Sequence, residues 1–145
     1  MERILITGAD GQLGTELQNT GPKNFELLAL GRDKLDISAV ESIADTIGQF
    51  KPTVVINAAA YTAVDQAEAE PEEAKQINSL APGYLAAACR KSRAMLIHIS
   101  TDFVFDGLGN TPYKPDSKTS PLGSYGRTKL LGEEKILEEL STALI

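Results

Sequence analysis

The sequence has little of the chemistry that cross-links a chain or anchors it in a membrane. It contains one cysteine, Cys89, and no tryptophan in 145 residues. One cysteine excludes an internal disulfide and a zinc site made of cysteines, and its alanine-rich surroundings indicate a small buried residue. No apolar run approaches the ~18 residues of a membrane span. We therefore expect a cytoplasmic protein without a membrane span, and we assign no metal site.

Positive charge is also scarce. Lys and Arg total 14 against 20 for Asp and Glu, which gives a formal net charge of −6. This balance argues against DNA or RNA as a partner, because phosphate backbones need clustered cations. It leaves room for one phosphorylated small molecule held by backbone amides. With 42% hydrophobic and 23% charged residues, the chain can bury a core, and its length suits one domain, residues 1–145.

The hydrophobic pattern switches repeatedly between strand-like and helix-like periods. We expect strands at residues 3–7, 25–30, 53–57 and 95–99, and helices at residues 11–18, 40–50, 72–91 and 125–140. Strands that alternate with helices predict parallel βαβ units with right-handed crossovers. The expected fold is therefore an α/β, doubly wound parallel sheet of the Rossmann type.

Local signals mark some of the expected helix boundaries. Ser38 and Glu41 have the spacing of a capping box before the second helix. Pro52 ends that helix, because the proline ring disfavours helical geometry in the residue before it. Pro82 falls inside the third helix and predicts a kink or a division there.

The last residues, 143–145, form an apolar triplet typical of the start of another strand. A sheet of this class normally continues past four strands. We therefore expect the chain to be the N-terminal part of a longer protein, with a sheet truncated before its last strands. An unfinished sheet exposes an apolar edge, so we also expect a tendency to associate, for example as a homodimer.

A glycine-rich turn follows the first expected strand. Residues 8–14 read GADGQLG and lead into a helix. This G-x-x-G-x-x-G spacing is related to the dinucleotide fingerprint, in which the glycines permit a tight turn, close approach of a pyrophosphate and close helix packing. A glycine turn that binds nothing has the same spacing. The strand–turn–helix context favours a dinucleotide site, with phosphates at the helix N-terminus.

The end of the second strand bears on the choice between NAD and NADP. An acidic residue there bonds the ribose 2′-hydroxyl, whereas an arginine accepts a 2′-phosphate. Arg32 precedes Asp33 at this point, so we favour NADP and keep NAD as a possible cofactor. The alternative for Arg32 is a solvated surface charge.

Tyr125 and Lys129 lie four residues apart on one face of the last expected helix. A nearby ammonium stabilises a phenolate, so such a pair can pass a proton while a nicotinamide transfers a hydride. This spacing is weak by itself, since an exposed helix pair looks the same. Thr101 follows the fourth strand and residues 57–60 follow the third, at the sheet edge where ligands bind. We therefore expect the hydroxyls of Tyr125 and Thr101 to lie close together.

Two further features have ordinary structural interpretations. His98 alternates within an apolar strand and is expected to be buried and hydrogen-bonded rather than catalytic. The acidic run at residues 68–73 (EAEPEE) is interpreted as a solvated helix start, because carboxylates favour the first turn of a helix.

Four segments, in this order, resemble the dTDP-4-dehydrorhamnose reductase family of the extended short-chain dehydrogenase/reductase superfamily. They are residues 6–14, 57–68, 100–107 and 125–133. The resemblance implies NADPH-dependent reduction of the 4-keto group of dTDP-6-deoxy-L-lyxo-4-hexulose to dTDP-L-rhamnose. It also implies a further C-terminal domain that closes over the nucleotide sugar and that this chain lacks.

Roles carried over from the family are expectations from this resemblance. Tyr125 would be the proton donor, Lys129 would stabilise its phenolate and bond the nicotinamide ribose, and Thr101 would bond the keto oxygen. Asn78 would match a structural asparagine of the proton relay. The cofactor would be contacted by Gly8, Gly11, Gln12, Leu13, Gly14, Asp36, Ile37, Ala58, Ala59, Ala60 and Tyr61, together with Arg32, Tyr125 and Lys129.

Two alternatives to the reductase remain. One is a sugar-nucleotide epimerase or dehydratase of the same superfamily, although Phe103 follows Asp102 where dehydratases place a glutamate. The other is a non-catalytic regulatory subunit that keeps the cofactor fold, which the presence of Tyr125, Lys129 and Thr101 disfavours.

Overall fold

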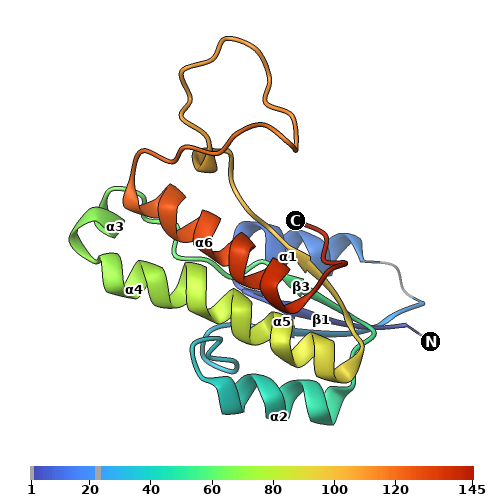
Figure 1. The fold of residues 1–145 in the computed structure, drawn as a ribbon. Coiled ribbons are helices and arrows are strands. Elements are labelled where there is room, and N and C mark those ends of the chain that lie inside the picture. The colour runs from blue at the N-terminus through green and yellow to red at the C-terminus, as the bar shows by residue number, and fades with distance from the viewer. Residues whose placement is uncertain (1, 22–23) are drawn as a thin grey trace.

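A parallel four-stranded sheet forms the centre of the protein (Figure 1). The computed structural model describes residues 2–21 and 24–145. The strands are β1 (Arg3–Thr7), β2 (Glu26–Leu30), β3 (Val54–Asn57) and β4 (Met95–His98), in the order β2-β1-β3-β4. All four expected strands are confirmed, each to within a residue of its expected ends.

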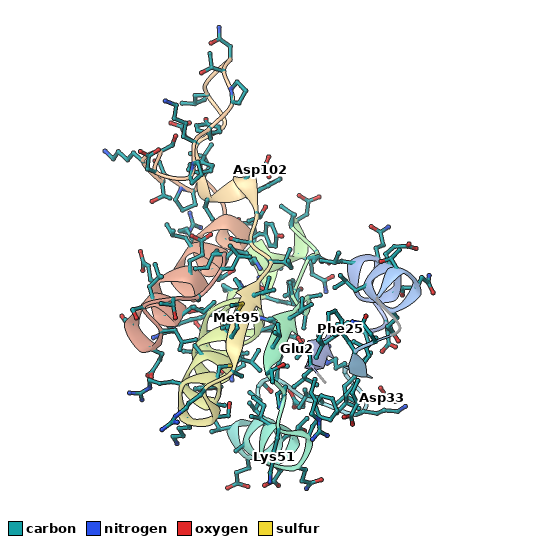
Figure 2. The ribbon with its side chains drawn as sticks, turned by 90° about the vertical axis from the view of Figure 1, so that its right-hand side faces the viewer. Glu2, Phe25, Asp33, Lys51, Met95 and Asp102 are labelled. Atoms are coloured by element: carbon teal, nitrogen blue, oxygen red, sulfur yellow. The ribbon has the colours of Figure 1, made fainter. Side chains whose placement is uncertain are left out.

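Helices cover both faces of the sheet. Helix α1 (Gln12–Thr20) connects β1 to β2 in one direction across the sheet, whereas the later connections run in the other direction. Right-handed crossovers therefore place α1 on one face and α2 (Val40–Phe50), α5 (Ala81–Ser92) and α6 (Ser124–Glu139) on the other (Figure 2). The main core lies on this second face, where Leu5, Val55 and Leu96 pack against side chains of these three helices. The doubly wound Rossmann-type fold is thus confirmed.

The expected helix at 72–91 is divided by a π-helical stretch. Helix α4 (Pro71–Lys75) runs into η1 (Gln76–Leu80) and then into α5, and the Ala81 N–H bonds to the Gln76 carbonyl five residues back. Pro82 has no N–H to offer the Asn78 carbonyl. That carbonyl faces α6, where a Cβ on Gly132 would lie 2.1 Å from its oxygen. The two helices therefore meet at backbone distance.

The predicted capping box at the start of α2 is wrong. Ala39 is the N-cap and no side chain caps the helix, while the Ser38 hydroxyl donates to Asp36 Oδ1 at 2.6 Å. The Asp36 carboxylate, two residues before Ser38, thus binds the serine hydroxyl in a local turn, and the hydroxyl does not cap the helix. The predicted end is confirmed, since Lys51 follows the helix in the left-handed region with φ 51°.

The end of the chain returns to the sheet beside β4. Leu144 forms a parallel bridge with Ile97, and its N–H donates to the Leu96 carbonyl at 3.0 Å. The apolar end therefore pairs as a strand, as its composition predicts. Between η2 (Asp102–Val104) and α6, the connecting loop extends away from the body of the protein (Figure 1). Among the described residues, no helix is long and apolar enough to cross a membrane.

Two glycines give opposite predictions for substitution by alanine. Gly132→Ala places a methyl group against the Asn78 carbonyl, so we expect the free energy of unfolding to fall by about 1–3 kcal/mol. Gly48 lies within α2 with nothing near its Cβ position, so Gly48→Ala is expected to raise it by about 0.5–1 kcal/mol. Urea unfolding followed by circular dichroism measures both. Equal effects of the two variants would contradict the close packing of α6.

Candidate functional site

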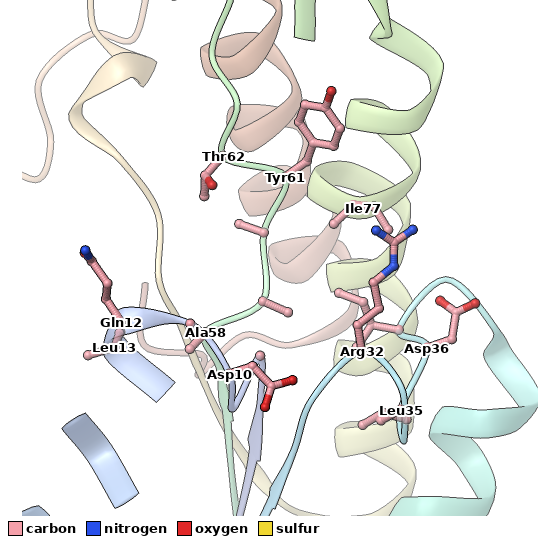
Figure 3. A pocket seen from close by; sticks show the side chains of 15 residues that line it. Asp10, Gln12, Leu13, Arg32, Leu35, Asp36, Ala58, Tyr61, Thr62 and Ile77 are labelled. Atoms are coloured by element: carbon pink, nitrogen blue, oxygen red, sulfur yellow. The ribbon is translucent and has the colours of Figure 1, made fainter. Parts of the chain in front are cut away.

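A cavity of about 540 Å³ opens at the carboxyl ends of β1, β2 and β3 (Figure 3). Eleven of its fifteen lining residues were predicted to contact a cofactor: Gly8, Gly11, Gln12, Leu13, Arg32, Asp36, Ile37, Ala58, Ala59, Ala60 and Tyr61. The other four, which the sequence did not single out, are Asp10, Leu35, Thr62 and Ile77. The predicted residues Gly14, Tyr125 and Lys129 do not line the cavity.

The glycine turn forms one wall of this cavity. Gly8 has φ 68°, and a Cβ there would lie 2.6 Å from the Ala59 nitrogen. A Cβ on Gly14 would lie 2.2 Å from the Gly8 carbonyl oxygen, so Gly14 permits helix packing rather than ligand contact. Gly11 is the N-cap of α1 and no side chain caps the helix. The N-terminus of α1 can therefore offer its amides to a phosphate.

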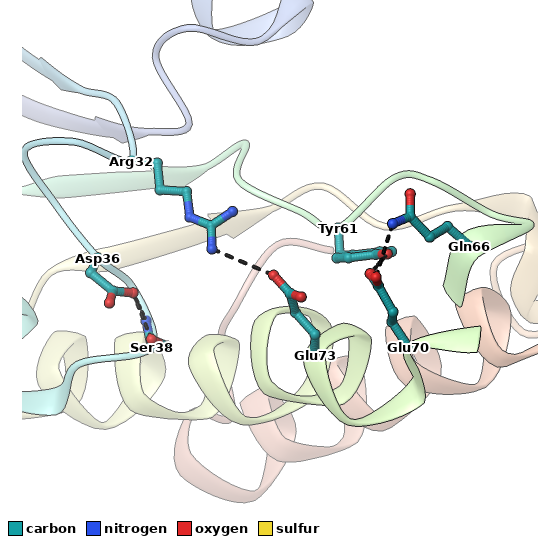
Figure 4. Close-up of polar contacts among 7 residues, drawn as sticks. All are labelled: Arg32, Asp36, Ser38, Tyr61, Gln66, Glu70 and Glu73. Carbon is teal, nitrogen blue, oxygen red and sulfur yellow. Dashed lines mark hydrogen bonds and ion pairs between the residues drawn. The ribbon is translucent and has the colours of Figure 1, made fainter. Parts of the chain in front are cut away.

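The opposite end of the cavity is rich in carboxylates. The Arg32 guanidinium lies 3.5 Å from a carboxylate oxygen of Glu73, and its side chain is 82% exposed (Figure 4). Hydrogen bonds from the Ser38 hydroxyl and N–H hold the pKa of Asp36 below its usual value. The Asp10 carboxylate packs against Gly31, the residue before Arg32. A charged ligand group at this end of the cavity would meet the Arg32 guanidinium together with the carboxylates of Glu73, Asp36 and Asp10.

A row of buried polar side chains runs along the carboxyl ends of β1, β3 and β4. The Thr7 hydroxyl donates to Asn57 Oδ1 at 2.6 Å, and Asn57 Nδ2 lies 2.9 Å from His98 Nδ1. Asn57 Oδ1 also accepts from the Ala59 N–H at 3.3 Å, which fixes the start of the cavity wall. The prediction that His98 is buried and hydrogen-bonded is confirmed.

The protonation of His98 follows from these contacts. An amide N–H donated to Nδ1 leaves the ring proton on Nε2, which has no hydrogen-bond partner within the described part of the chain. Burial, with the nearby positive charge of Lys129, lowers the pKa of His98 to about 3. The imidazole is therefore neutral at physiological pH.

Helix α6 places the predicted catalytic side chains along the segment that follows β4. Lys129 is 1% exposed, and its Nζ donates to the Ile99 carbonyl at 2.6 Å. The Phe103 N–H donates to Thr101 Oγ1 at 3.2 Å, and the Phe103 ring packs edge-on against Tyr125 with centroids 5.5 Å apart. Tyr125 and Thr101 thus share Phe103 as a common neighbour. Burial lowers the pKa of Lys129 to about 8, so its ammonium form still predominates at neutral pH.

Asn78 connects the cavity wall to α6. Its side-chain oxygen accepts from the Tyr61 N–H at 2.8 Å, and its side-chain nitrogen donates to the Tyr61 carbonyl at 3.0 Å. The same nitrogen lies 3.3 Å from Thr128 Oγ1 on α6. These contacts give Asn78 a structural role. A part in proton relay, implied by the family resemblance, stays a prediction.

The acidic run at residues 68–73 leads into a helix as predicted, since α4 starts at Pro71 and the exposed Glu72 and Glu73 lie in its first turn. Three carboxylates of the run also have partners that the sequence analysis did not predict. Glu68 accepts from the N–H of Ser124 at the start of α6. Glu70 accepts from the Tyr61 hydroxyl at 2.5 Å and raises the pKa of that phenol to about 12 (Figure 4). Glu73 pairs with Arg32. These partners are distant in sequence, so local charge patterning did not reveal them.

The neutral state of His98 predicts a pH dependence of stability. The folded chain keeps His98 unprotonated down to about pH 3, whereas the ordinary value is 6.5. Between these values the unfolded chain binds the extra proton, so the free energy of unfolding falls as the pH drops from about 6.5 towards 3. In His98→Gln the free energy of unfolding, measured with urea, should fall less over the same pH range. Carboxylates contribute to both proteins alike, so parallel curves would contradict this assignment.

Comparison with known proteins identifies the family of this chain. The model of the RmlD substrate binding domain family matches residues 1–145. A dTDP-4-dehydrorhamnose reductase of Burkholderia thailandensis is 44% identical over 136 residues, covering 94% of this chain and 46% of the relative. A probable dTDP-4,6-dihydroxy-2-methyloxan-3-one 4-ketoreductase of Streptomyces antibioticus is 44% identical over 145 residues, covering 99% of this chain and 49% of the relative.

The fold is also shared with solved structures. A crystal structure of dTDP-4-dehydrorhamnose reductase from Bacillus anthracis in complex with NADP superposes with a TM-score of 0.95 at 35% identity, over 98% of this chain and 51% of that chain. The present chain thus spans about half the length of the relatives it matches. Because the family model matches it from end to end, the chain belongs to the RmlD substrate binding domain family.

Proposed function

We propose that this chain is the dinucleotide-binding part of an NADPH-dependent reductase. The proposed reaction reduces the 4-keto group of dTDP-6-deoxy-L-lyxo-4-hexulose to dTDP-L-rhamnose. The observation that carries the proposal is the placement of Tyr125 and Lys129 along the Thr101 segment, at the sheet edge where the glycine-walled cavity opens. A relative with NADP bound and relatives named for this activity support it.

The cavity has the features that a dinucleotide requires. The tight Gly8 turn and the uncapped N-terminus of α1 suit a pyrophosphate. The small side chains of residues 58–60 let a flat group approach the backbone. Arg32 stands at the other end, where a 2′-phosphate would fall, and NAD remains a possible cofactor because of the carboxylates around it.

The chain's own residues would handle the proton of the reaction. NADPH supplies a hydride to the keto carbon. The Thr101 hydroxyl holds the keto oxygen, and Tyr125 donates a proton to that oxygen, which completes the alcohol. The Lys129 ammonium, buried beside the same segment, stabilises the resulting phenolate because few waters compete with it.

Other features of the whole protein belong to the same proposal. The sugar nucleotide would be its small-molecule substrate, and a homodimer and a cytoplasmic location are expectations. The relative from Streptomyces antibioticus, named for a different 4-ketoreductase reaction, makes a related 4-keto sugar the second candidate substrate. A regulatory subunit that binds cofactor without turnover, and an epimerase or dehydratase, are outcomes that the following assays distinguish.

Substitution of the proton donor tests the reaction. With the complete product of the gene, Tyr125→Phe should lower the rate of NADPH consumption with the 4-keto sugar by about 10²- to 10⁴-fold. Tyr84→Phe, on the core side of α5, is the matched control and should retain activity. Cofactor binding without turnover in the unsubstituted protein would instead indicate the regulatory subunit.

Arg32 is expected to set cofactor preference. Arg32→Ala removes the cation nearest a 2′-phosphate, so NADPH binding should weaken by about 10-fold, in keeping with a charged hydrogen bond, while NADH binding changes little. Fluorescence titration with each cofactor measures this. Arg90→Ala, in the last turn of α5 at the opposite edge of the sheet, serves as the control. Equal weakening of both cofactors would contradict a phosphate-binding role.

A further inference from the structure

Helix α6 begins without a capping side chain of its own. Its N-cap is Gly123, which makes no side-chain hydrogen bond. The first amides of a helix need acceptors, and here the acceptor comes from α3 (Gln66–Ala69). Glu68 Oε1 accepts from the Ser124 N–H at 2.5 Å, and Glu68 Oε2 accepts from the Ser124 hydroxyl at 2.9 Å. A residue far away in sequence thus caps the helix that carries Tyr125.

The fit around this cap is close. A Cβ on Gly123 would lie 2.9 Å from Glu68 Oε1. One turn into α6, Arg127 lies 3.9 Å from Glu68 Oε2 and donates to the Ser124 hydroxyl oxygen at 3.2 Å. The hydrogen bonds from Ser124 hold the pKa of Glu68 below its usual value. The carboxylate is therefore ionised at neutral pH and lies at the positive end of the helix dipole.

The first turn of α6 is held from a second side as well. A Cβ on Gly126 would lie 2.2 Å from the Phe103 carbonyl oxygen, two residues after Thr101. Tyr125 therefore lies between Ser124, whose N–H bonds to Glu68, and Gly126, which packs on the Phe103 carbonyl. Glu68 itself is held by its own element, because Ala67 beside it is fully buried.

We propose that Glu68 is a positioning residue, which fixes the first turn of α6 and so holds Tyr125 opposite Thr101. This role rests on the proposed reductase function. In this role Glu68 acts through Ser124, and it does not line the cavity proposed to hold the cofactor. Loss of the cap lets the first turn fray, and Tyr125 then spends less time in the geometry required for proton donation. We therefore expect kcat to fall and KM for NADPH to stay the same, since the cavity residues that bind the dinucleotide stay in place.

The test compares two variants at this position in the complete gene product. Glu68→Ala removes both acceptors, and we expect kcat to fall by about 10- to 100-fold, the scale of a misplaced catalytic group, with KM for NADPH unchanged. Glu68→Gln keeps an oxygen that accepts from the Ser124 N–H, so it should restore most of kcat. Glu72→Ala, which removes an exposed carboxylate from the first turn of the neighbouring α4, is the matched control.

Hydrogen exchange separates this proposal from the proposed reaction. In Glu68→Ala the amides of residues 124–128 should exchange faster than in the unsubstituted chain, and in Glu68→Gln they should not. Unchanged exchange in Glu68→Ala overturns the cap, whether or not the protein reduces the sugar. Faster exchange with unchanged kcat overturns the positioning role. A protein that turns over no keto sugar refutes the reaction and with it the catalytic part of this inference, while the exchange result stands alone.

Discussion

The candidate site depends on one hydrogen-bonded row across the sheet. Thr7, Asn57 and His98 are register partners on β1, β3 and β4, and their side chains bond to one another where the strands end. Buried polar groups are costly unless they are paired, so a slip of one strand would break the row. The row therefore stabilises the register of β1, β3 and β4 at their carboxyl ends. Through Ala59 it also places the wall against which the Gly8 turn packs.

This row ends near a buried cation, and burial, together with the charge of that cation, determines where the protons reside. Two positive charges in one apolar surrounding would repel strongly. His98 is therefore neutral, whereas Lys129 stays protonated and its ammonium donates a hydrogen bond to the Ile99 carbonyl. Burying the ammonium is unfavourable for stability. In the proposed reaction that cost would serve catalysis, because Lys129 follows Tyr125 by one turn of α6 and a weakly solvated cation stabilises a phenolate more than an exposed one does.

The sequence predicted what depends on neighbours along the chain. Strands, the glycine turn and the shared face of Tyr125 and Lys129 follow from local periods of two and 3.6 residues. The capping box at Ser38 failed because Asp36, two residues away, competes for the same hydroxyl. The roles of the carboxylates in residues 68–73 were missed for a different reason. Their partners, Arg32, Tyr61 and Ser124, lie outside the run, so the charge spacing within the run cannot predict them.

The cavity and α6 are joined through the segment between β3 and α5. Asn78 holds both backbone polar groups of Tyr61 and reaches Thr128, while its own carbonyl meets α6 at Gly132. Asn78 lies in the π-helical stretch at Gln76–Leu80, and such irregular turns are frequent at functional sites. The irregular stretch thus carries the residue that connects the Tyr61 segment of the cavity to Thr128 on α6.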